Sequence, residues 1–417
     1  MKILRAICAS TLAMVVGCAG PDSDSASAPR PEHVLVGVTV IDGTGTQAKP
    51  GQTIEITNGR ITAIRPTVPG DSATLDVAGS FVTPGLIDAH VHLPADRALL
   101  GAALDSMLSL GITAARQMSA LPEYSQFLSD PDSSQFTRLY RSAYWAGPTY
   151  MRDDPRVREA YAAAGHVPWL LAVTDTTDLG AGLRGAHESG VTGIKIYSDL
   201  EPSLVRAVAA SARDSGMRVW SHSVVFPTRP SVIAASGVHV MSHAAFFVWE
   251  GAGEMPLTYN GAHVWSPFGP PAPYGTVSHD DPAVVAVLET MRDRGVILDP
   301  TITLMALLSE EARTWAANLT RLAHEMGIRI CTGTDAAVLF DEIEALVNEV
   351  GLNPLEALAS ATSVGAAAIG VDGDLGSLEV GKVADVVVYP SDPSVDITAL
   401  RRPSHVFRSG NLVRPRR

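Results

Sequence analysis

The chain has 417 residues, 46% of them apolar, and can therefore bury at least one large core. Its formal net charge is −13 with acidic and basic residues interspersed, which argues against a nucleic-acid partner, because phosphate binding needs a concentrated Lys/Arg surface. The chain contains only three cysteines, so no disulfide framework is expected.

Residues 1–18 have the pattern of an export signal. Lys2 and Arg5 supply positive charge, and an almost uninterrupted apolar run follows over residues 6–16. That run is too short to span a bilayer as a stable anchor. We therefore expect an exported protein.

The apolar run ends in Val-Val-Gly-Cys, which resembles the lipobox of bacterial lipoproteins. The resemblance implies that Cys18 is lipidated and, with Ala19 next to it, that the protein is anchored in the outer membrane facing the periplasm. The alternative is an ordinary cleaved signal peptide, which leaves a soluble periplasmic or secreted protein. Residues 19–32 are rich in Ser, Ala, Pro and Asp, which predicts a disordered tether.

Both ends of the folded body have the texture of β-structure. Residues 33–83 contain short alternating apolar runs such as VLVGVTVID and QTIEITNGRITAIRP, separated by turn signals. The same texture returns over residues 371–417. Two β-rich ends that flank one long middle predict a small β-sandwich domain built from both termini.

The middle, residues 84–370, alternates strand-like and helix-like stretches, the rhythm of βα units around a buried parallel sheet. Such a pattern predicts an α/β chain with a (β/α)8 TIM barrel, whose active site lies at the carboxyl ends of the strands; an open doubly wound sheet is the alternative. Residues 246–282 are Gly/Pro-rich and aromatic, which predicts a lid. The eight strand-like runs are LIDAHVHL, GITAARQM, TRLYRSAYW, TGIKIY, MRVWSHS, VHVMSHA, GVILDPTI and IRICTGTDA.

Polar side chains of ligand type recur near the ends of these runs. His90 and His92 are two residues apart on one strand, so both imidazoles face the same side, as a divalent metal requires. Hydrogen-bonded core histidines explain that motif alone equally well. Because a barrel collects its functional groups at this end, we expect a shared site that also includes Lys195, His222, His243 and Asp335.

The motifs VTVIDGTG, GRITAI, FVTPGLIDAHVHL, KIY, SHS, SHA, TGTDA and GSLEVGKVADVVV together resemble the amidohydrolase superfamily over about residues 33–415. Within it, the chain is most similar to the branch of imidazolonepropionase-related and Xaa-Pro dipeptidase-like enzymes. The resemblance implies two divalent metal ions, with zinc expected. It assigns His90, His92 and Asp335 to the first metal, His222 and His243 to the second, and carboxylated Lys195 as the bridge.

The resemblance also implies a mechanism. A carbamate on Lys195 would be an anionic oxygen ligand like a glutamate. A metal-bound hydroxide would attack the carbonyl, and Asp335 would serve as catalytic base as well as ligand. Arg116 and Tyr197 are candidates for binding a substrate carboxylate or the developing oxyanion, with a structural role as the alternative for each.

We therefore expect an enzyme that hydrolyses a carbon–nitrogen bond in dipeptide or N-acyl amino acid substrates, with esters and lactones also open. A mononuclear cyclic amidohydrolase or deaminase is the first alternative, and a non-catalytic metal-binding lipoprotein is the second. The expected partner is a small-molecule substrate, and no nucleic acid. Membrane contact is expected only through the lipid anchor, and a homo-oligomer is compatible with the sequence.

Overall fold

A computed structural model describes residues 31–119, 135–164, 167–260, 272–336 and 338–413. Pro31–Arg417 forms one compact unit. The predicted signal peptide, Cys18 and all but the last two residues of the predicted tether lie outside the described residues. Within the described ranges, no helix combines the length and apolar character needed to cross a membrane.

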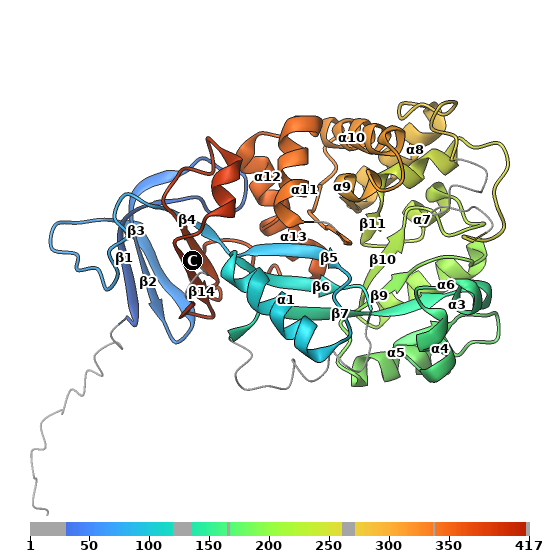
Figure 1. The fold of residues 1–417 in the computed structure, drawn as a ribbon, viewed down its shortest axis with the longest axis horizontal. Helices are drawn as coiled ribbons and strands as arrows, with labels where there is room; N and C mark the ends of the chain where they lie inside the picture. Colours follow the sequence, from blue (N-terminus) through green and yellow to red (C-terminus); the bar gives the residue numbers. More distant parts are fainter. Residues whose placement is uncertain (1–30, 120–134, 165–166, 261–271, 337, 414–417) are drawn as a thin grey trace, which may run out of the picture. The chain divides into compact units, whose positions relative to one another are not determined.

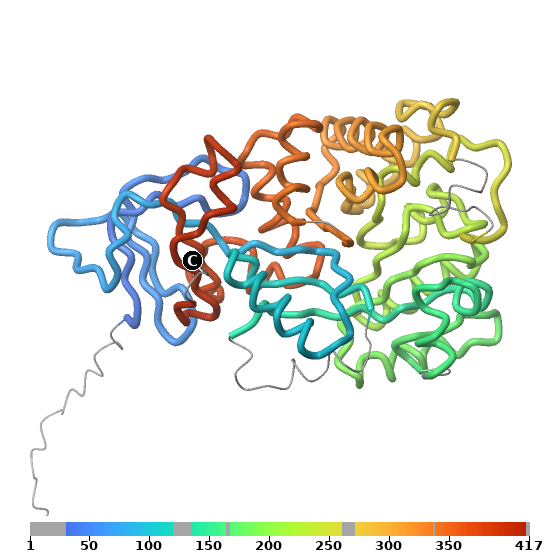
Figure 2. The backbone as a smooth tube through the Cα atoms, viewed as in Figure 1, coloured from blue at the N-terminus to red at the C-terminus, as the bar shows by residue number. Residues whose placement is uncertain are grey.

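Strands from both ends of the described chain form one seven-stranded sheet, in the order β15-β14-β13-β4-β1-β2-β3. In Figures 1 and 2 the blue strands of the N-terminal part lie beside the red C-terminal ones. The prediction of two packed sheets differs from this single hydrogen-bonded sheet, which has its own apolar core around Leu35, Ile54 and Phe407. Its strands are β1 (His33–Val40), β2 (Lys49–Thr57), β3 (Arg60–Pro66), β4 (Phe81–Pro84), β13 (Val386–Tyr389), β14 (His405–Arg408) and β15 (Asn411–Val413).

The turn between β2 and β3 shows how local sequence sets the sheet register. Asn58 and Gly59 both have positive φ, 51° and 72°, as the Asn-Gly pair of a tight hairpin requires. Gly59 is also restricted by space, because a Cβ there would lie 2.8 Å from the carbonyl oxygen of Ser409. The hairpin therefore packs directly against the C-terminal strands.

The second sheet is a parallel, nearly closed barrel in the order β12-β11-β10-β9-β7-β6-β5 (Figure 1). Seven of the eight predicted runs form its regular strands. A short strand, β8, pairs with β7 outside this path. The strands are β5 (Leu86–Val91), β6 (Ile112–Gln117), β7 (Arg138–Ala146), β8 (Leu170–Ala172), β9 (Gly193–Ile196), β10 (Arg218–His222), β11 (Val240–Ser242) and β12 (Ile297–Asp299).

The eighth predicted run closes the barrel without forming a regular strand. Its residues make isolated parallel bridges, Ile330 to Leu298 of β12 and Asp335 to Val91 of β5. Gly333 lies between them where a Cβ would be 2.4 Å from an oxygen of Asp299, so the chain passes too close to its neighbours for a larger residue. The amides of Thr334 and Asp335 both donate to the carbonyl of His90. This irregular closure places Asp335 beside the β5 histidines.

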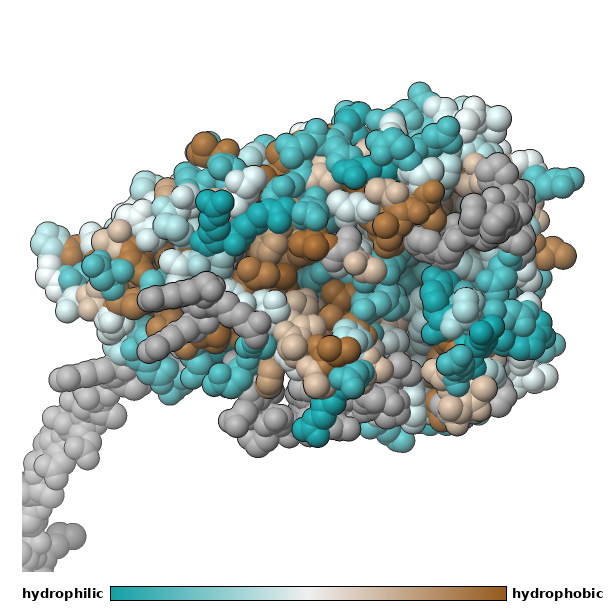
Figure 3. All heavy atoms as spheres, viewed as in Figure 1, coloured by the Kyte–Doolittle hydropathy of each residue, from teal (hydrophilic) through white to brown (hydrophobic). Residues whose placement is uncertain are grey.

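Helices cover the barrel strands (Figure 1). In α6, for example, Val205, Val208, Ala209 and Ala212 recur at helical spacing and are buried. On the face shown in Figure 3, hydrophobic residues occur in separate groups between hydrophilic ones. The helices are α1 (Arg97–Ser109), α3 (Pro148–Asp153), α4 (Arg158–Ala164), α5 (Leu179–Glu188), α6 (Pro202–Asp214), α7 (Pro230–Ala235), α8 (Pro282–Arg294), α9 (Ile302–Met305), α10 (Glu310–Glu325), α11 (Leu339–Ala345), α12 (Pro354–Ser360) and α13 (Ser363–Ile369), with short helical turns η3 (Ala244–Glu250), η4 (Leu346–Val350) and η5 (Ile397–Arg401).

Candidate metal centre

Ligand-type side chains from several barrel strands meet at the carboxyl end of the barrel. Ligand atoms of His90, His243 and Asp335 all lie within 4.8 Å of one another. His90 belongs to β5, His243 follows β11, and Asp335 ends the closing segment. The structure thus brings together residues that are up to 245 positions apart in the chain (335 − 90).

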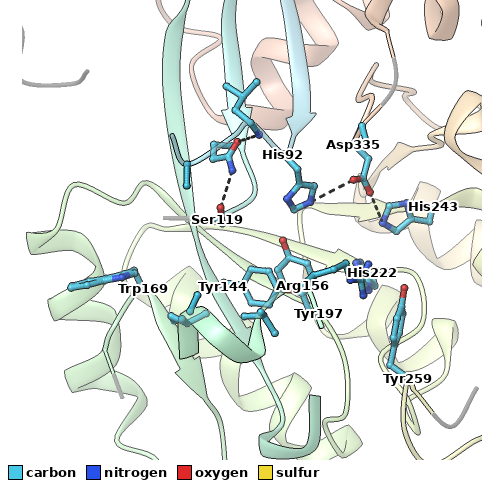
Figure 4. A pocket seen from close by; sticks show the side chains of 17 residues that line it. His92, Ser119, Tyr144, Arg156, Trp169, Tyr197, His222, His243, Tyr259 and Asp335 are labelled. Carbon is cyan, nitrogen blue, oxygen red and sulfur yellow. Dashed lines mark hydrogen bonds and ion pairs between the residues drawn. The ribbon is translucent and has the colours of Figure 1, made fainter. Parts of the chain in front are cut away.

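Asp335 lies at the centre of this group. Its Oδ2 is 3.6 Å from His90 Nε2 and 3.7 Å from His243 Nε2, and its Oδ1 is 3.6 Å from His92 Nε2. Figure 4 shows His92 and His243 pointing toward the carboxylate from opposite sides. The His222 ring joins the group through His243, with ring centroids 4.8 Å apart. The four predicted histidines and the predicted aspartate therefore lie close together.

Burial disfavours the charged form of three of these histidines, and two of the four carry a buried ring nitrogen without a hydrogen-bond partner among the described residues. Burial lowers the pKa of His92 to about 4 and those of His222 and His243 well below the usual value. Neutral imidazole is the form that binds a metal. Among the described residues, neither the buried Nε2 of His90 nor Nδ1 of His222 has a hydrogen-bond partner. Buried nitrogens without partners beside a carboxylate fit a divalent cation.

Lys195, on β9, is wholly buried beside this group. Its Nζ donates a 2.8 Å hydrogen bond to Oγ of Ser242, the residue before His243. Burial lowers the pKa of Lys195 to about 8, although Asp299 and Asp335 act in the opposite direction. A larger share of the amine is therefore neutral near pH 7, which is the form that reacts with carbon dioxide.

A layer of buried groups behind the candidate ligands fixes their orientation. Asp299, which ends β12, lies with Oδ2 2.7 Å from Nδ1 of His90, and both side chains are buried. Nδ1 of His243 lies 2.9 Å from Oγ1 of Thr301. Each contact uses the ring nitrogen that does not face Asp335, so each directs Nε2 into the site.

Asp88 belongs to the same layer of buried groups. It accepts hydrogen bonds from the backbone amide of His90, at 3.2 Å, and from the hydroxyl of Thr334, at 2.8 Å. Because Thr334 precedes Asp335, these bonds couple β5 to the closing segment. The sequence prediction did not include Asp299 and Thr301, although Asp299 ends its strand in the same way as the predicted ligands.

The two predicted substrate contacts lie in different places. Tyr197 lines the pocket at the metal centre, stacks on Tyr144 and donates a 2.6 Å hydrogen bond to the carbonyl of Met118. Arg116 is not among the residues that line this pocket. It is wholly buried, with hydrogen bonds to Ser142 and to the Ile369 carbonyl. The geometry gives Arg116 a structural role instead, so we do not retain it as a substrate contact.

A pocket of about 430 Å³ opens onto the candidate metal centre (Figure 4). Metal-centre residues form one wall, and aromatic and aliphatic side chains form most of the rest. The lining consists of His92, Leu93, Ala95, Gln117, Ser119, Tyr144, Arg156, Val157, Ala160, Trp169, Leu170, Tyr197, His222, His243, Tyr259, Asp335 and Ala336. Concave, largely apolar surroundings with a few polar groups are typical of small-molecule sites.

The predicted lid, residues 246–282, contributes to this pocket through Tyr259. Trp249 packs against Phe226 in the core, with ring centroids 5.3 Å apart, and Tyr274 lines a separate pocket beside Trp315. Residues 261–271, which include Trp265 and Phe268 of the predicted lid, lie outside the described residues.

Known proteins resemble parts of the sequence and the whole fold. The Amidohydrolase family model matches residues 274–413, which include Asp335. An imidazolonepropionase of Symbiobacterium thermophilum is 67% identical over 39 residues, which are 9% of this chain and 9% of that protein. An adenine deaminase of Bradyrhizobium sp. is 30% identical over 88 residues, 20% of this chain and 15% of that protein. The chain therefore matches only a small part of the length of these curated relatives.

The similar solved structures cover nearly the full length. A Xaa-Pro dipeptidase with bound methionine has a TM-score of 0.71 at 21% identity, over 91% of this chain and 99% of that one. A putative prolidase from Bifidobacterium longum has a TM-score of 0.69 at 24% identity, over 93% and 97%. The ochratoxinase of A. niger has a TM-score of 0.72 at 16% identity, over 93% and 97%. At these identities the likeness establishes the fold, a barrel with an attached β-sheet domain.

Proposed function

We propose that the protein is a metal-dependent hydrolase of the amidohydrolase superfamily that cleaves a carbon–nitrogen bond in a dipeptide or N-acyl amino acid. The observation that carries the proposal is the convergence of His90, His92 and His243 on Asp335 at the mouth of the barrel. The family match over residues 274–413 and the fold shared with prolidases support it.

The donor set fits one or two divalent ions. His90, His92 and Asp335 would hold the first, and His222 and His243 the second, with carboxylated Lys195 between them. Zinc is the metal that this set of imidazoles and oxygen ligands suits best. When bound, such ions lower the pKa of a water molecule toward neutrality and polarise a carbonyl oxygen.

Asp335 is the residue that moves the proton. Burial alone would raise its pKa, but the nearby His92, His90 and Lys195 together lower it below the usual value. The carboxylate is therefore ionised near pH 7 and can accept a proton from the attacking water at Oδ1 or Oδ2. Passing that proton to the amine nitrogen completes cleavage of the amide. The buried Asp299 and Thr301 contacts hold the surrounding imidazoles in place during the transfer.

A second candidate is a mononuclear enzyme that opens a cyclic amide or deaminates a heterocycle. Two observations favour it: His90, His243 and Asp335 lie close enough to bind a single ion, and short segments match an imidazolonepropionase and adenine deaminases. The two candidates differ in the number of ions and in the need for Lys195.

Metal analysis of the purified mature chain, followed by assay of the metal-loaded protein on amide, ester and lactone panels, tests the proposal. We expect about two ions per chain and amide hydrolysis, both lost in Lys195→Ala but kept in Lys49→Ala, a control at an exposed lysine. One ion retained in Lys195→Ala would favour the mononuclear candidate. Absence of hydrolysis on every panel with the metal bound would overturn the enzyme proposal in favour of a non-catalytic metal-binding protein.

A further inference from the structure

Arg156 is the single Lys or Arg side chain among the described residues that line the pocket at the metal centre. Its side chain is 46% exposed, whereas that of its partner Asp154 is only 2% exposed. A ligand in the pocket can therefore reach the guanidinium, while the carboxylate that orients it is covered. The structure thus presents one accessible fixed cation near the reaction centre.

The guanidinium is held in a defined orientation. Its Nε donates to Oδ1 of Asp154 at 2.9 Å, and Nη2 donates to Oδ2 of Asp154 at 2.7 Å. Nη2 also donates to the hydroxyl of Tyr150 at 2.9 Å. The ring of Tyr259 lies against the group, 5.2 Å from the guanidinium carbon. A positioned arginine of this kind loses little side-chain entropy when it binds a ligand.

Arg156 lines the same pocket as His92, His222 and Asp335. Figure 4 shows Arg156 on the same side of the pocket as Tyr197 and His222. A substrate whose scissile bond lies at Asp335 therefore shares its pocket with this cation.

The other residues that line the pocket indicate what else the ligand carries. Leu93, Val157, Ala160, Trp169 and Leu170 give this pocket an apolar part. An apolar surface beside one cation favours a ligand that carries an apolar group and a single negative charge. Because Asp154 and Tyr150 accept from Nε and Nη2, a substrate carboxylate would bind this guanidinium at Nη1.

We propose that Arg156 binds the free carboxylate of the substrate and is its specificity-determining residue. The substrate class is then an amide with an apolar amino acid whose α-carboxylate is unblocked. This assignment rests on the proposed function, and it replaces Arg116 with Arg156 as the arginine that contacts the substrate. Asp154 is a positioning residue in this arrangement, because it orients Arg156 and is itself covered.

The test compares N-acetyl-L-leucine with N-acetyl-L-leucinamide, which have the same scissile bond but differ in the charge of the leucine end. Both kcat/KM and binding by calorimetry are measured on the metal-loaded chain. We expect the wild type to favour the carboxylate about 10- to 100-fold, and Arg156→Gln to lose this preference. Arg156→Lys keeps the charge without the planar group that Asp154 orients, and it should retain part of the preference for the carboxylate. Arg313→Gln is the matched control, because Arg313 pairs with Glu349 through the same two kinds of nitrogen outside the pocket.

A preference for the carboxylate that survives in Arg156→Gln overturns the assignment, as does a wild type that binds and cleaves both compounds equally. Binding that favours the carboxylate in the wild type and not in Arg156→Gln, without hydrolysis of either compound, supports the assignment but contradicts the proposed function. The two proposals therefore fail in different ways.

Discussion

Replacing Asp299 with asparagine removes the negative charge next to His90 while it keeps the size and shape of the side chain. The two side chains are 0% and 1% exposed, and their 2.7 Å contact joins Asp299 Oδ2 to His90 Nδ1. The carboxylate fixes the tautomer in which Nε2 carries the lone pair, and it makes that nitrogen a stronger base. Asparagine can rotate to accept the same hydrogen bond, but it cannot supply the charge.

The expected loss follows from this geometry. Groups that orient a metal-binding histidine typically contribute 10- to 100-fold in metal affinity, about 1.4–2.7 kcal/mol. The buried hydrogen bond to a charged acceptor also contributes roughly 1.5–3 kcal/mol to stability. Asp299→Asn should therefore bind zinc about 10- to 100-fold more weakly, and its metal-free form should unfold at a lower denaturant concentration.

Competition with a chromogenic zinc chelator measures the affinity, and urea unfolding of the metal-free chain measures stability. Asp385→Asn is the control, because Asp385 is also buried but lies in the β-sheet domain, where it accepts a 2.7 Å hydrogen bond from the Ser409 amide. The control should lose stability and keep its zinc affinity. If Asp299→Asn binds zinc as tightly as the wild type does, the reasoning is refuted, whatever the change in stability.

Two other predictions concern buried charged groups outside the pocket. Burial raises the pKa of Glu342 to about 7 from a value of 4.5, so the folded state holds this proton more tightly than the unfolded state. The free energy of unfolding should therefore fall by roughly 3 kcal/mol as the pH rises from about 4.5 to about 7, and urea unfolding of Glu342→Gln should lack this part of the slope. A slope identical to that of the wild type would contradict the assignment. Arg116→Ala leaves buried acceptors such as the Ile369 carbonyl unpaired and should lower the free energy of unfolding by roughly 2–4 kcal/mol. Its KM should stay at the wild-type value, and an increase of tenfold or more in the folded variant would restore Arg116 as a substrate contact.

Most of the barrel could be predicted because buried parallel strands are short apolar runs that end in turn signals. Two features of the barrel could not be predicted. The closing segment is irregular because Gly333 lies against Asp299 and His90, a contact that no local pattern reveals. The three residues of β8 lie in a stretch too short to distinguish from a loop. The β-sheet domain was predicted from both termini, but alternation alone does not show whether such strands form one sheet or two.

Some residues of the candidate site could likewise be predicted from the sequence, and others could not. The histidines, Lys195 and Asp335 could be chosen as candidates because each lies at or near the end of a strand-like run, and parallel strands end at one rim. Asp299 has that same signal in the run VILDP and could have been found. Arg156 and Tyr259 lie in connecting segments, so only tertiary packing brings them to the pocket. For Arg116, sequence position could not show that the guanidinium turns toward Trp220, 4.4 Å from its ring.

Backbone strain is concentrated around the site. Six described non-glycine residues have positive φ, and four of them follow barrel strands: Asp199, His243, Thr301 and Asp335. This conformation costs roughly 1–2 kcal/mol for each residue with a Cβ, and glycine would avoid the cost. Glycine cannot replace them, because each uses its side chain: His243 and Asp335 face each other, Thr301 contacts His243, and Asp199 accepts the amide of Tyr259 at 2.7 Å.

At two of these residues, hydrogen bonds to neighbouring backbone hold the strained conformation. The amide of His243 donates to the carbonyl of Asp299 at 2.8 Å, and the amide of Asp335 donates to the carbonyl of His90 at 2.8 Å. His243 and Asp335 are therefore each tied to a neighbouring strand near its carboxyl end. Because the same strand ends also carry Asp299 and His90, the bonds that hold the backbone and those that orient the imidazoles form one network. The side chain of Asp299 orients His90, and its backbone carbonyl holds His243, so the positions of both histidines depend on this one strand end.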